Sequence, residues 1–270
     1  FVPFTCSLLQ RDDQRKILLR IVVIEAAAAN LGSMATPIGN PQNLYLYSTY
    51  SFSLGIFFKT ILPIVGISYI GLLFSLLLIP QQPLAAEIPT ESHLPLSAQK
   101  KNLIIYSILG VVCLATVAGL VTHVVCFCVV LLGIIVTDRA LIRRVDWELL
   151  LTFVCFFLFS GNLQQIESVR NLMMQGLSGG VCLTAALVSQ VISNVPAAVL
   201  LSGFTKQGKE LLMGVDIGGL GTPIASLASL IAYQYYAKSK LANPAKYLQF
   251  FFIYQFIGLF LLLAMKFIML

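Results

Sequence analysis

Hydrophobic residues occur along this chain in long uncharged blocks rather than in alternation with polar ones. Seven stretches without a charged residue cover residues 26–58, 60–86, 102–137, 149–166, 171–205, 217–237 and 247–265. A helix needs about 20 apolar residues to span the hydrocarbon layer, and most of these stretches are close to or above that length. The ~10-residue alternating strands of an outer-membrane barrel are not seen. The pattern therefore predicts an all-α membrane protein with roughly seven to nine membrane segments.

Composition and charge agree with this fold class. Hydrophobic residues make up 58% of the 270 residues and charged residues 10%, whereas a soluble domain carries about 25% charged residues. Most of the basic residues gather in four loops, as Arg11, Arg15 and Lys16, then Lys100 and Lys101, then Arg139, Arg143 and Arg144, then Lys238, Lys240 and Lys246. Because cytoplasmic loops are enriched in Lys and Arg, we expect these loops to share the cytoplasmic face. The net charge of +6 is then a topology signal and predicts no nucleic-acid partner.

Two of the apolar blocks are interrupted by the same Gly-x-x-x-Thr-Pro-Ile phrase. It occupies Gly32–Ile38 and recurs 186 residues later at Gly218–Ile224. The same offset pairs Asn30 with Asp216. Backbone groups freed by Gly and Pro are tolerated at membrane depth only where protein or a wet cavity satisfies them. The matched breaks therefore predict a transporter of two related halves, with its site at the breaks.

The polar stretch at residues 81–101 separates the two predicted halves and is expected to be a cytoplasmic linker. Residues 1–80 would be the remainder of the first repeat, with a broken helix at about 17–50 and an intact span at about 58–79. Residues 102–270 would be the second repeat. Phe1 is not an initiator Met, and the opening residues read as the tail of a membrane helix. We therefore expect further spans upstream of the first residue.

The first break is rich in amide side chains. Residues 30–43 contain two prolines, two glycines and three asparagines, and Pro37 and Pro41 each remove a backbone donor, so a helix cannot continue there. Open carbonyls and hydroxyls suit a hard cation, and the N-termini of half-helices suit an anion. The candidate binding residues of this break are Asn30, Gly32, Ser33, Thr36, Pro37, Gly39, Asn40 and Asn43.

A second candidate lies in the uncharged stretch 171–205, which is too long for one straight span. We predict a re-entrant hairpin at about 180–204 with Ser193-Asn194-Val195-Pro196 at its tip. A single kinked helix with an interhelical asparagine is the alternative. A broken helix at about 211–236 follows, and its candidate binding residues are Gly218, Gly219, Gly221, Thr222 and Pro223.

Ionisable residues inside predicted spans are rare and usually functional. Glu25 and Asp216 are the two acidic ones, and either would bind a coupling cation or relay a proton. For Glu25, a structural pair with Arg20 is the alternative. Lys266 is expected to extend to the membrane interface. The six cysteines form no CxxC pair, so they predict packing residues and no metal site.

At these residues the chain resembles the ion transporter superfamily of di- and tricarboxylate carriers, citrate–metal symporters, arsenite permeases and some sodium/proton antiporters. Thr36 to Asn43 matches the family loop Thr-Pro-Ile-Gly-x-Pro-x-Asn, Ser193-Asn194 matches a hairpin tip, and Gly218 to Ile224 matches the second broken helix. Two departures stand out. Val195, followed by Pro196, occupies the threonine position of the carboxylate carriers, and the second loop lacks the Pro-x-Asn ending. The Val195-Pro196 tip resembles the arsenite-permease and antiporter branch more, and both departures count against a Na⁺-coupled dicarboxylate mechanism.

The resemblance implies an inverted-repeat, elevator-type transporter, commonly a homodimer, in the cytoplasmic membrane. We expect it to carry a small anion such as a di- or tricarboxylate, coupled to Na⁺ or H⁺ and needing no other cofactor. The alternatives are arsenite or oxyanion export and sodium/proton antiport. No Ser/His or paired-Asp arrangement suggests an enzyme. The 186-residue offset places the first hairpin tip at Ser7-Leu8, which does not match. Either the linker lengths differ between the halves or, as we expect, that tip lies upstream of Phe1.

Overall fold

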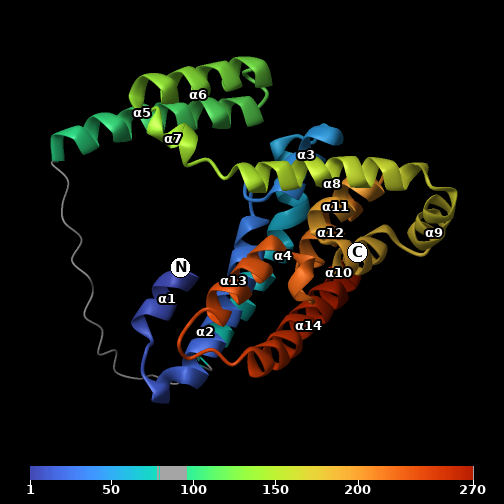
Figure 1. The fold of residues 1–270 in the computed structure, drawn as a ribbon. Coiled ribbons are helices and arrows are strands. Elements are labelled where there is room, and N and C mark those ends of the chain that lie inside the picture. Colours follow the sequence, from blue (N-terminus) through green and yellow to red (C-terminus); the bar gives the residue numbers. More distant parts are fainter. Residues whose placement is uncertain (78, 80–95, 270) are drawn as a thin grey trace. The chain divides into compact units, whose positions relative to one another are not determined.

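The computed structural model describes residues 1–77, 79 and 96–269, and the described part is all-helical, with fourteen α-helices and two short 3₁₀ turns. The chain divides into two compact units, one made of residues 1–87 and 155–270 and the other of residues 88–154. Figure 1 shows the helices in chain order. We call residues 1–87 and 155–270 unit 1, and residues 88–154 unit 2.

Unit 1 contains both helix breaks. In its first part, α1 (Val2–Leu8) precedes α2 (Arg15–Ser33) and α3 (Pro41–Thr49), which are separated by residues 34–40. The long helix α4 (Leu54–Leu77) follows and runs unbroken through Pro63. The first break thus lies between α2 and α3 and overlaps the phrase that predicts it.

The second part of unit 1 also contains a broken helix, α12 and α13, followed by a long helix, α14. It contains α9 (Glu167–Ser178), α10 (Val181–Ile192), α11 (Asn194–Ser202), α12 (Gly208–Ile217), α13 (Leu227–Ala237) and α14 (Pro244–Met269). Between α12 and α13 the chain is non-helical except for the 3₁₀ turn Pro223–Ala225. Although α2 and α13 are far apart in sequence, they run side by side in unit 1 (Figure 1).

Small residues bring α10 and α12 into close contact. A methyl group built at Gly214 would lie 2.5 Å from the carbonyl oxygen of Cys182, and one at Gly218 would lie 2.8 Å from the Cα of Ala186. Membrane helices commonly use such residues to let their backbones approach. This contact fixes the hairpin formed by α10 and α11 against α12, the helix that leads into the second break.

Gly161-Asn162 would be expected to end the helix α8 (Trp147–Gln165), but α8 continues three residues beyond Asn162. A glycine inside a helix costs only about 1 kcal/mol. Polar contacts to α11 hold the extra turn. Ser160 Oγ donates to the Pro196 carbonyl at 3.2 Å, and Gln164 Nε2 donates to the Val199 carbonyl at 3.0 Å.

Lys266 near the end of α14 also differs from expectation. Its side chain is buried, and Nζ forms an ion pair with Glu210 Oε2 of α12 at 2.7 Å. A buried ammonium group needs such a partner. The lysine therefore anchors α14 to α12 instead of extending to the membrane interface.

Unit 2 consists of α5 (Leu96–Val117), α6 (His123–Thr137), α7 (Ala140–Arg143) and the first residues of α8. α5 and α6 form a hairpin whose outer surface is apolar; Leu103 and Leu132, for example, are more than half exposed. Exposed apolar surface of this extent is expected for helices that face lipid. α5 begins at Leu96, so the last residues of the predicted linker are helical, and residues 81–95 lie outside the described part.

Three helices in the described part, α4, α8 and α14, are long and apolar enough to cross a membrane. Shorter apolar helices occur in α5, α6 and α10. A helix of 15 residues, such as α6, spans only about 22 Å. Short helices of this kind are the pieces from which broken and re-entrant segments are built.

Candidate functional site

The first break is stabilised by its own asparagines. Asn40 has an extended backbone and caps α3, since its Oδ1 accepts from the backbone N–H of Asn43 at 2.8 Å. Asn43 Nδ2 donates back to the carbonyls of Met34 and Thr36, at 3.1 and 3.2 Å. Gly39 is required because a methyl group there would lie 1.9 Å from the Ser33 carbonyl oxygen. The loop between α2 and α3 is therefore closed by these bonds.

The second break is capped in the same way by serines. Ser226 lies 186 residues after Asn40, and its Oγ accepts from the backbone N–H of Ser229 at 3.2 Å, beginning α13. Ser229 in turn lies 186 residues after Asn43. The sequence showed no Pro-x-Asn ending here, but Ser226 and Ser229 occupy the equivalent positions and make the equivalent cap. Gly221, at φ +109°, allows the turn.

The two breaks bond to each other through buried side chains. Asn30 Nδ2, on α2, donates to the Gly219 carbonyl at 3.0 Å and to Ser229 Oγ at 3.3 Å. Asp216 Oδ1, on α12, accepts from Asn40 Nδ2 at 3.2 Å and from Gln42 Nε2 at 3.3 Å. Asn30 and Asp216 are equivalent under the 186-residue offset, and each contacts the cap of the opposite break. Four of the predicted site residues are thus brought together here: Asn30, Asn40, Asp216 and Gly219.

The hairpin tip meets the second break. Ser193 joins α10 to α11 at φ +73°, a value that is uncommon for a non-glycine residue and that often marks functional sites. Its Oγ donates to the Ala225 carbonyl at 3.3 Å. Asn194 is buried against the same break, because a methyl group on Gly219 would lie 3.0 Å from Asn194 Nδ2. The neighbouring Val195 and Pro196 are buried within unit 1.

Gln190 is a site residue that sequence reasoning missed. Its Nε2, which carries two hydrogens, lies within hydrogen-bonding distance of the carbonyl oxygens of Ala186, Gly218 and Leu220, at 3.0, 2.8 and 3.0 Å. Its Oε1 accepts from the backbone N–H of Thr222 at 2.8 Å, and Thr222 Oγ1 donates to the Gln190 carbonyl at 3.0 Å. One amide thereby satisfies most of the backbone opened by the second break. Its signal in the sequence was a glutamine inside an apolar helix.

Several predicted site residues lie apart from this cluster. Glu25 accepts a hydrogen bond from Thr5 Oγ1 and lines a cavity of ≈570 Å³ with Phe1 and Tyr235; Arg20 is exposed and makes no pair with it. Gly32, in the last turn of α2, and Thr36, in the loop that follows, are exposed. Pro37 is buried, and Pro223 begins the 3₁₀ turn.

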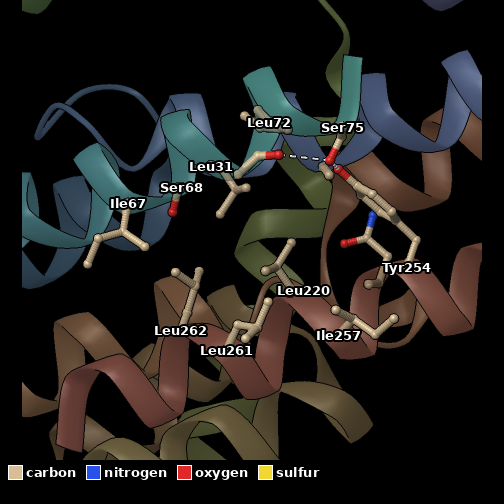
Figure 2. A pocket seen from close by; sticks show the side chains of 14 residues that line it. Leu31, Ile67, Ser68, Leu72, Ser75, Leu220, Tyr254, Ile257, Leu261 and Leu262 are labelled. Atoms are coloured by element: carbon tan, nitrogen blue, oxygen red, sulfur yellow. Dashed lines mark hydrogen bonds between the residues drawn. The ribbon is translucent and has the colours of Figure 1, made fainter. Parts of the chain in front are cut away.

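A smaller pocket of ≈160 Å³ lies between α2, α4 and α14 and is shown in Figure 2. Leucine and isoleucine make up half of its lining residues, and Tyr254 Oη donates to Ser75 Oγ at 2.8 Å at one end. The amide of Gln255 is buried there without a hydrogen-bond partner among the described residues. The apolar wall offers little to a charged ligand, so this pocket is distinct from the polar cluster at the breaks.

The cluster formed by the two breaks and the hairpin tip offers amides, hydroxyls and three helix N-termini. α3, α11 and α13 begin at Pro41, Asn194 and Leu227. Backbone N–H groups at a helix start are free to bind an anion, and the helix dipole favours negative charge there. Asp216 is the cluster's one carboxylate and would suit a cation. The arrangement can hold an anion and a cation close together without a lysine or arginine.

Comparison with known proteins identifies two relatives that match most of this chain. An uncharacterized transporter of Methanocaldococcus jannaschii is 33% identical over 216 residues, covering 80% of this chain and 58% of that protein. The inner membrane protein YbiR of Escherichia coli is 32% identical over 222 residues, covering 79% of this chain and 57% of that protein. The chain therefore spans less than three fifths of either relative. No solved structure matches.

The family model described as "Citrate transporter" matches residues 1–207. This range includes the first break and the hairpin, and it ends just before α12. The match covers well over half of the chain, and the apolar helices agree with a multi-pass membrane protein. The chain thus belongs to the citrate transporter family.

Proposed function

We propose that this chain forms part of a secondary active transporter that carries a small anion, of the di- or tricarboxylate class, across the inner membrane. The observation that supports this most is the hairpin tip. Ser193 has a strained backbone, and Asn194 lies buried against the broken helix α12–α13. A polar tip of this kind, packed on a helix break, would be costly in a membrane protein without a ligand to bind.

The chemistry of the cluster favours a weakly hydrated or multiply oxygenated anion. Asn40 and Ser193, the N-cap residues of α3 and α11, and Ser229 in the first turn of α13 each hydrogen-bond to another part of the cluster. An anion held by N–H and O–H donors is bound without a fixed positive charge. Such a site releases its cargo more easily than a salt bridge, as a carrier must.

Alternating access is part of the proposal. All the residues of the polar cluster belong to unit 1, and none belongs to unit 2. This division suits an elevator mechanism, in which one part carries the site and another stays fixed in the membrane. A homodimer built through the fixed part is the assembly that we propose.

A second candidate, export of arsenite or a related oxyanion, is favoured by one position. Val195 follows Ser193-Asn194 where a hydroxyl residue would be needed to bind a second carboxylate group, and the valine is buried. A smaller oxyanion has less need for that hydroxyl. We therefore include oxyanions among the substrates to be tested.

Uptake into proteoliposomes tests the proposal. The purified protein should accumulate labelled citrate, succinate, phosphate or arsenite under an imposed ion gradient. Asn194→Ala should reduce uptake by about tenfold or more, because about 1.4 kcal/mol of lost binding corresponds to a factor of ten. Val191→Ala is the matched control, since Val191 is 74% exposed on the neighbouring helix turn. No uptake of any anion by the wild-type protein, or full uptake by Asn194→Ala, would overturn the proposal.

A further inference from the structure

The pocket between α2, α4 and α14 is lined by one polar side chain that the described part of the chain leaves unsatisfied. Gln255 of α14 is only 1% exposed, and neither its Nε2 nor its Oε1 has a hydrogen-bond partner among the described residues. The hydroxyl groups of Ser68, Ser75 and Tyr254 in the same lining are each hydrogen-bonded. A buried amide without partners is unfavourable. A molecule in the pocket that pairs with this amide would therefore be stabilised by relieving that cost.

The pocket restricts the size and the charge of such a molecule. Its volume of ≈160 Å³ is close to that of an engineered apolar cavity of about 150 Å³ that binds benzene. None of the described residues that line it is acidic, basic or a histidine. Burying a charge without a partner of opposite sign is strongly unfavourable. These features favour an uncharged molecule with an apolar body about the size of a benzene ring.

The amide of Gln255 restricts the polar end of the molecule. A glutamine amide offers two N–H donors and one acceptor oxygen, and its terminal torsion is broad, so the amide can turn toward a bound group. A second primary amide pairs with both of its polar atoms at once, through one N–H···O bond in each direction. A carboxylate has no hydrogen to donate to Oε1. The pairing therefore favours an uncharged amide over an anion.

The rim of the pocket lies on an apolar surface of unit 1. Ile257 and Leu261, one turn apart on α14, line the pocket and are 55% and 59% exposed. The helices α4 and α14, which form two of its walls, are both long and apolar enough to cross a membrane. Exposed apolar surface on such helices is expected to face lipid. An uncharged molecule dissolved in the bilayer would reach the pocket from this side.

The pocket also reaches the second break. Leu220, between α12 and α13, forms part of its wall and is 2% exposed (Figure 2). A methyl group built at Gly258 of α14 would lie 3.3 Å from Leu220 Cδ1, so α14 packs closely on this leucine. The Leu220 carbonyl oxygen lies 3.0 Å from Gln190 Nε2, which ties the residue to the polar cluster. Because interiors are close-packed, a molecule that fills the space beside Leu220 removes the room in which the break could rearrange.

We propose that this pocket is a regulatory site, separate from the transport site, for a small uncharged molecule that carries a primary amide on a ring or branched apolar body. The amide pairs with Gln255, while the apolar body lies against Leu220 and holds the second break in place. Binding depends on the pocket alone, whereas its effect on uptake rests on the proposed transport function.

Equilibrium binding of radiolabelled probes to the purified protein in lipid nanodiscs tests the site. The probes are benzamide, its charged analogue benzoate and the purely apolar toluene, and binding to empty nanodiscs is subtracted. Benzamide should bind about tenfold or more tightly than benzoate, because the pocket offers no positive charge. In Gln255→Leu the affinity for benzamide should fall about tenfold or more, whereas that for toluene should be unchanged or higher.

Gln249→Leu is the matched control, since Gln249 is an exposed glutamine on the same helix, and it should bind benzamide as the wild type does. Gln255→Leu removes an unpaired polar group, so its unfolding midpoint should not be lower than that of the wild type. Equal affinity of the wild type and Gln255→Leu for benzamide, or no binding of benzamide beyond that to empty nanodiscs, would overturn the proposal.

Uptake into proteoliposomes gives the second readout. Benzamide should lower the maximal uptake rate of the transported anion, without raising the anion concentration that gives half of that rate, in the wild type and Gln249→Leu but not in Gln255→Leu. A purely competitive effect, or no effect while benzamide is bound, would contradict the regulatory role. If none of the three proteins takes up an anion, the proposed function fails, and the binding result still decides whether the pocket is a site.

Discussion

The two helix breaks share a backbone design but differ in side-chain chemistry. Asn40 and Asn43 cap and brace the first break, while Ser226 and Ser229 occupy the equivalent positions of the second. The first break is closed by an asparagine bonded to its own loop. The second is closed from outside, by Gln190 of the hairpin. A duplicated geometry can thus be maintained by different residues. Of the equivalent positions Asn30 and Asp216, only Asp216 contains a carboxyl group.

Replacing Gln190 should have the largest effect, because the second break depends on it and the first does not. Gln190→Ala removes three donor contacts and one acceptor contact to backbone. Unpaired buried backbone groups cost about 1–3 kcal/mol each, so we expect a loss of roughly 3 kcal/mol or more. Thermal unfolding in detergent would measure this, and uptake should be abolished. An unchanged midpoint would show that the second break closes without the hairpin.

Equivalent glycines should respond in opposite directions. A methyl group at Gly218 would lie 2.8 Å from Ala186 Cα, whereas one at Gly32 has no atom within 4 Å. Gly218→Ala should therefore destabilise the protein by about 2 kcal/mol through overpacking. Gly32→Ala should be neutral or stabilise it by about 0.5–1 kcal/mol, because alanine restricts the unfolded chain. Equal shifts in the two unfolding midpoints would show that the packing around Gly218 and Gly32 does not differ as described.

The caps should give smaller losses of stability than Gln190 and Gly218. Ser226→Ala is expected to cost about 1 kcal/mol, the usual value for a lost N-cap. Asn40→Ala should cost more than Ser226→Ala, because Asn40 also donates to Asp216 Oδ1 at 3.2 Å. The two unfolding midpoints, measured side by side, check the order. If Ser226→Ala were the more destabilising variant, the contact between Asn40 and Asp216 would contribute little to stability.

Much of this arrangement was visible in the sequence because Gly and Pro have strong local effects. The phrases at Gly32–Ile38 and Gly218–Ile224 mark the breaks, and Ser193-Asn194 marks the junction of α10 and α11. Asn30 and Asp216 were paired by their spacing alone. Their bonding to the opposite break was not visible, because it depends on packing between residues that are 199 and 176 positions apart.

Two kinds of feature escaped the sequence. Gln190 is one polar residue in an apolar helix, and its role depends on the carbonyls that α12 presents to it. Lys266 looked like an interfacial residue because its partner Glu210 lies in another helix. Both cases involve long side chains whose partner is chosen by tertiary packing. Local pattern therefore predicts where a chain breaks better than it predicts what satisfies the break.

The most direct test of the account asks whether the hairpin tip is reached from both sides of the membrane. Ser193→Cys would be made in a chain whose six native cysteines are replaced by alanine, and labelled with a membrane-impermeant maleimide added to either face. We predict labelling from both faces, slowed about tenfold or more by the transported anion because the anion binds at the tip. Labelling from one face only, at a rate that no transported anion changes, would contradict the placement of the transport site at the hairpin and the two breaks.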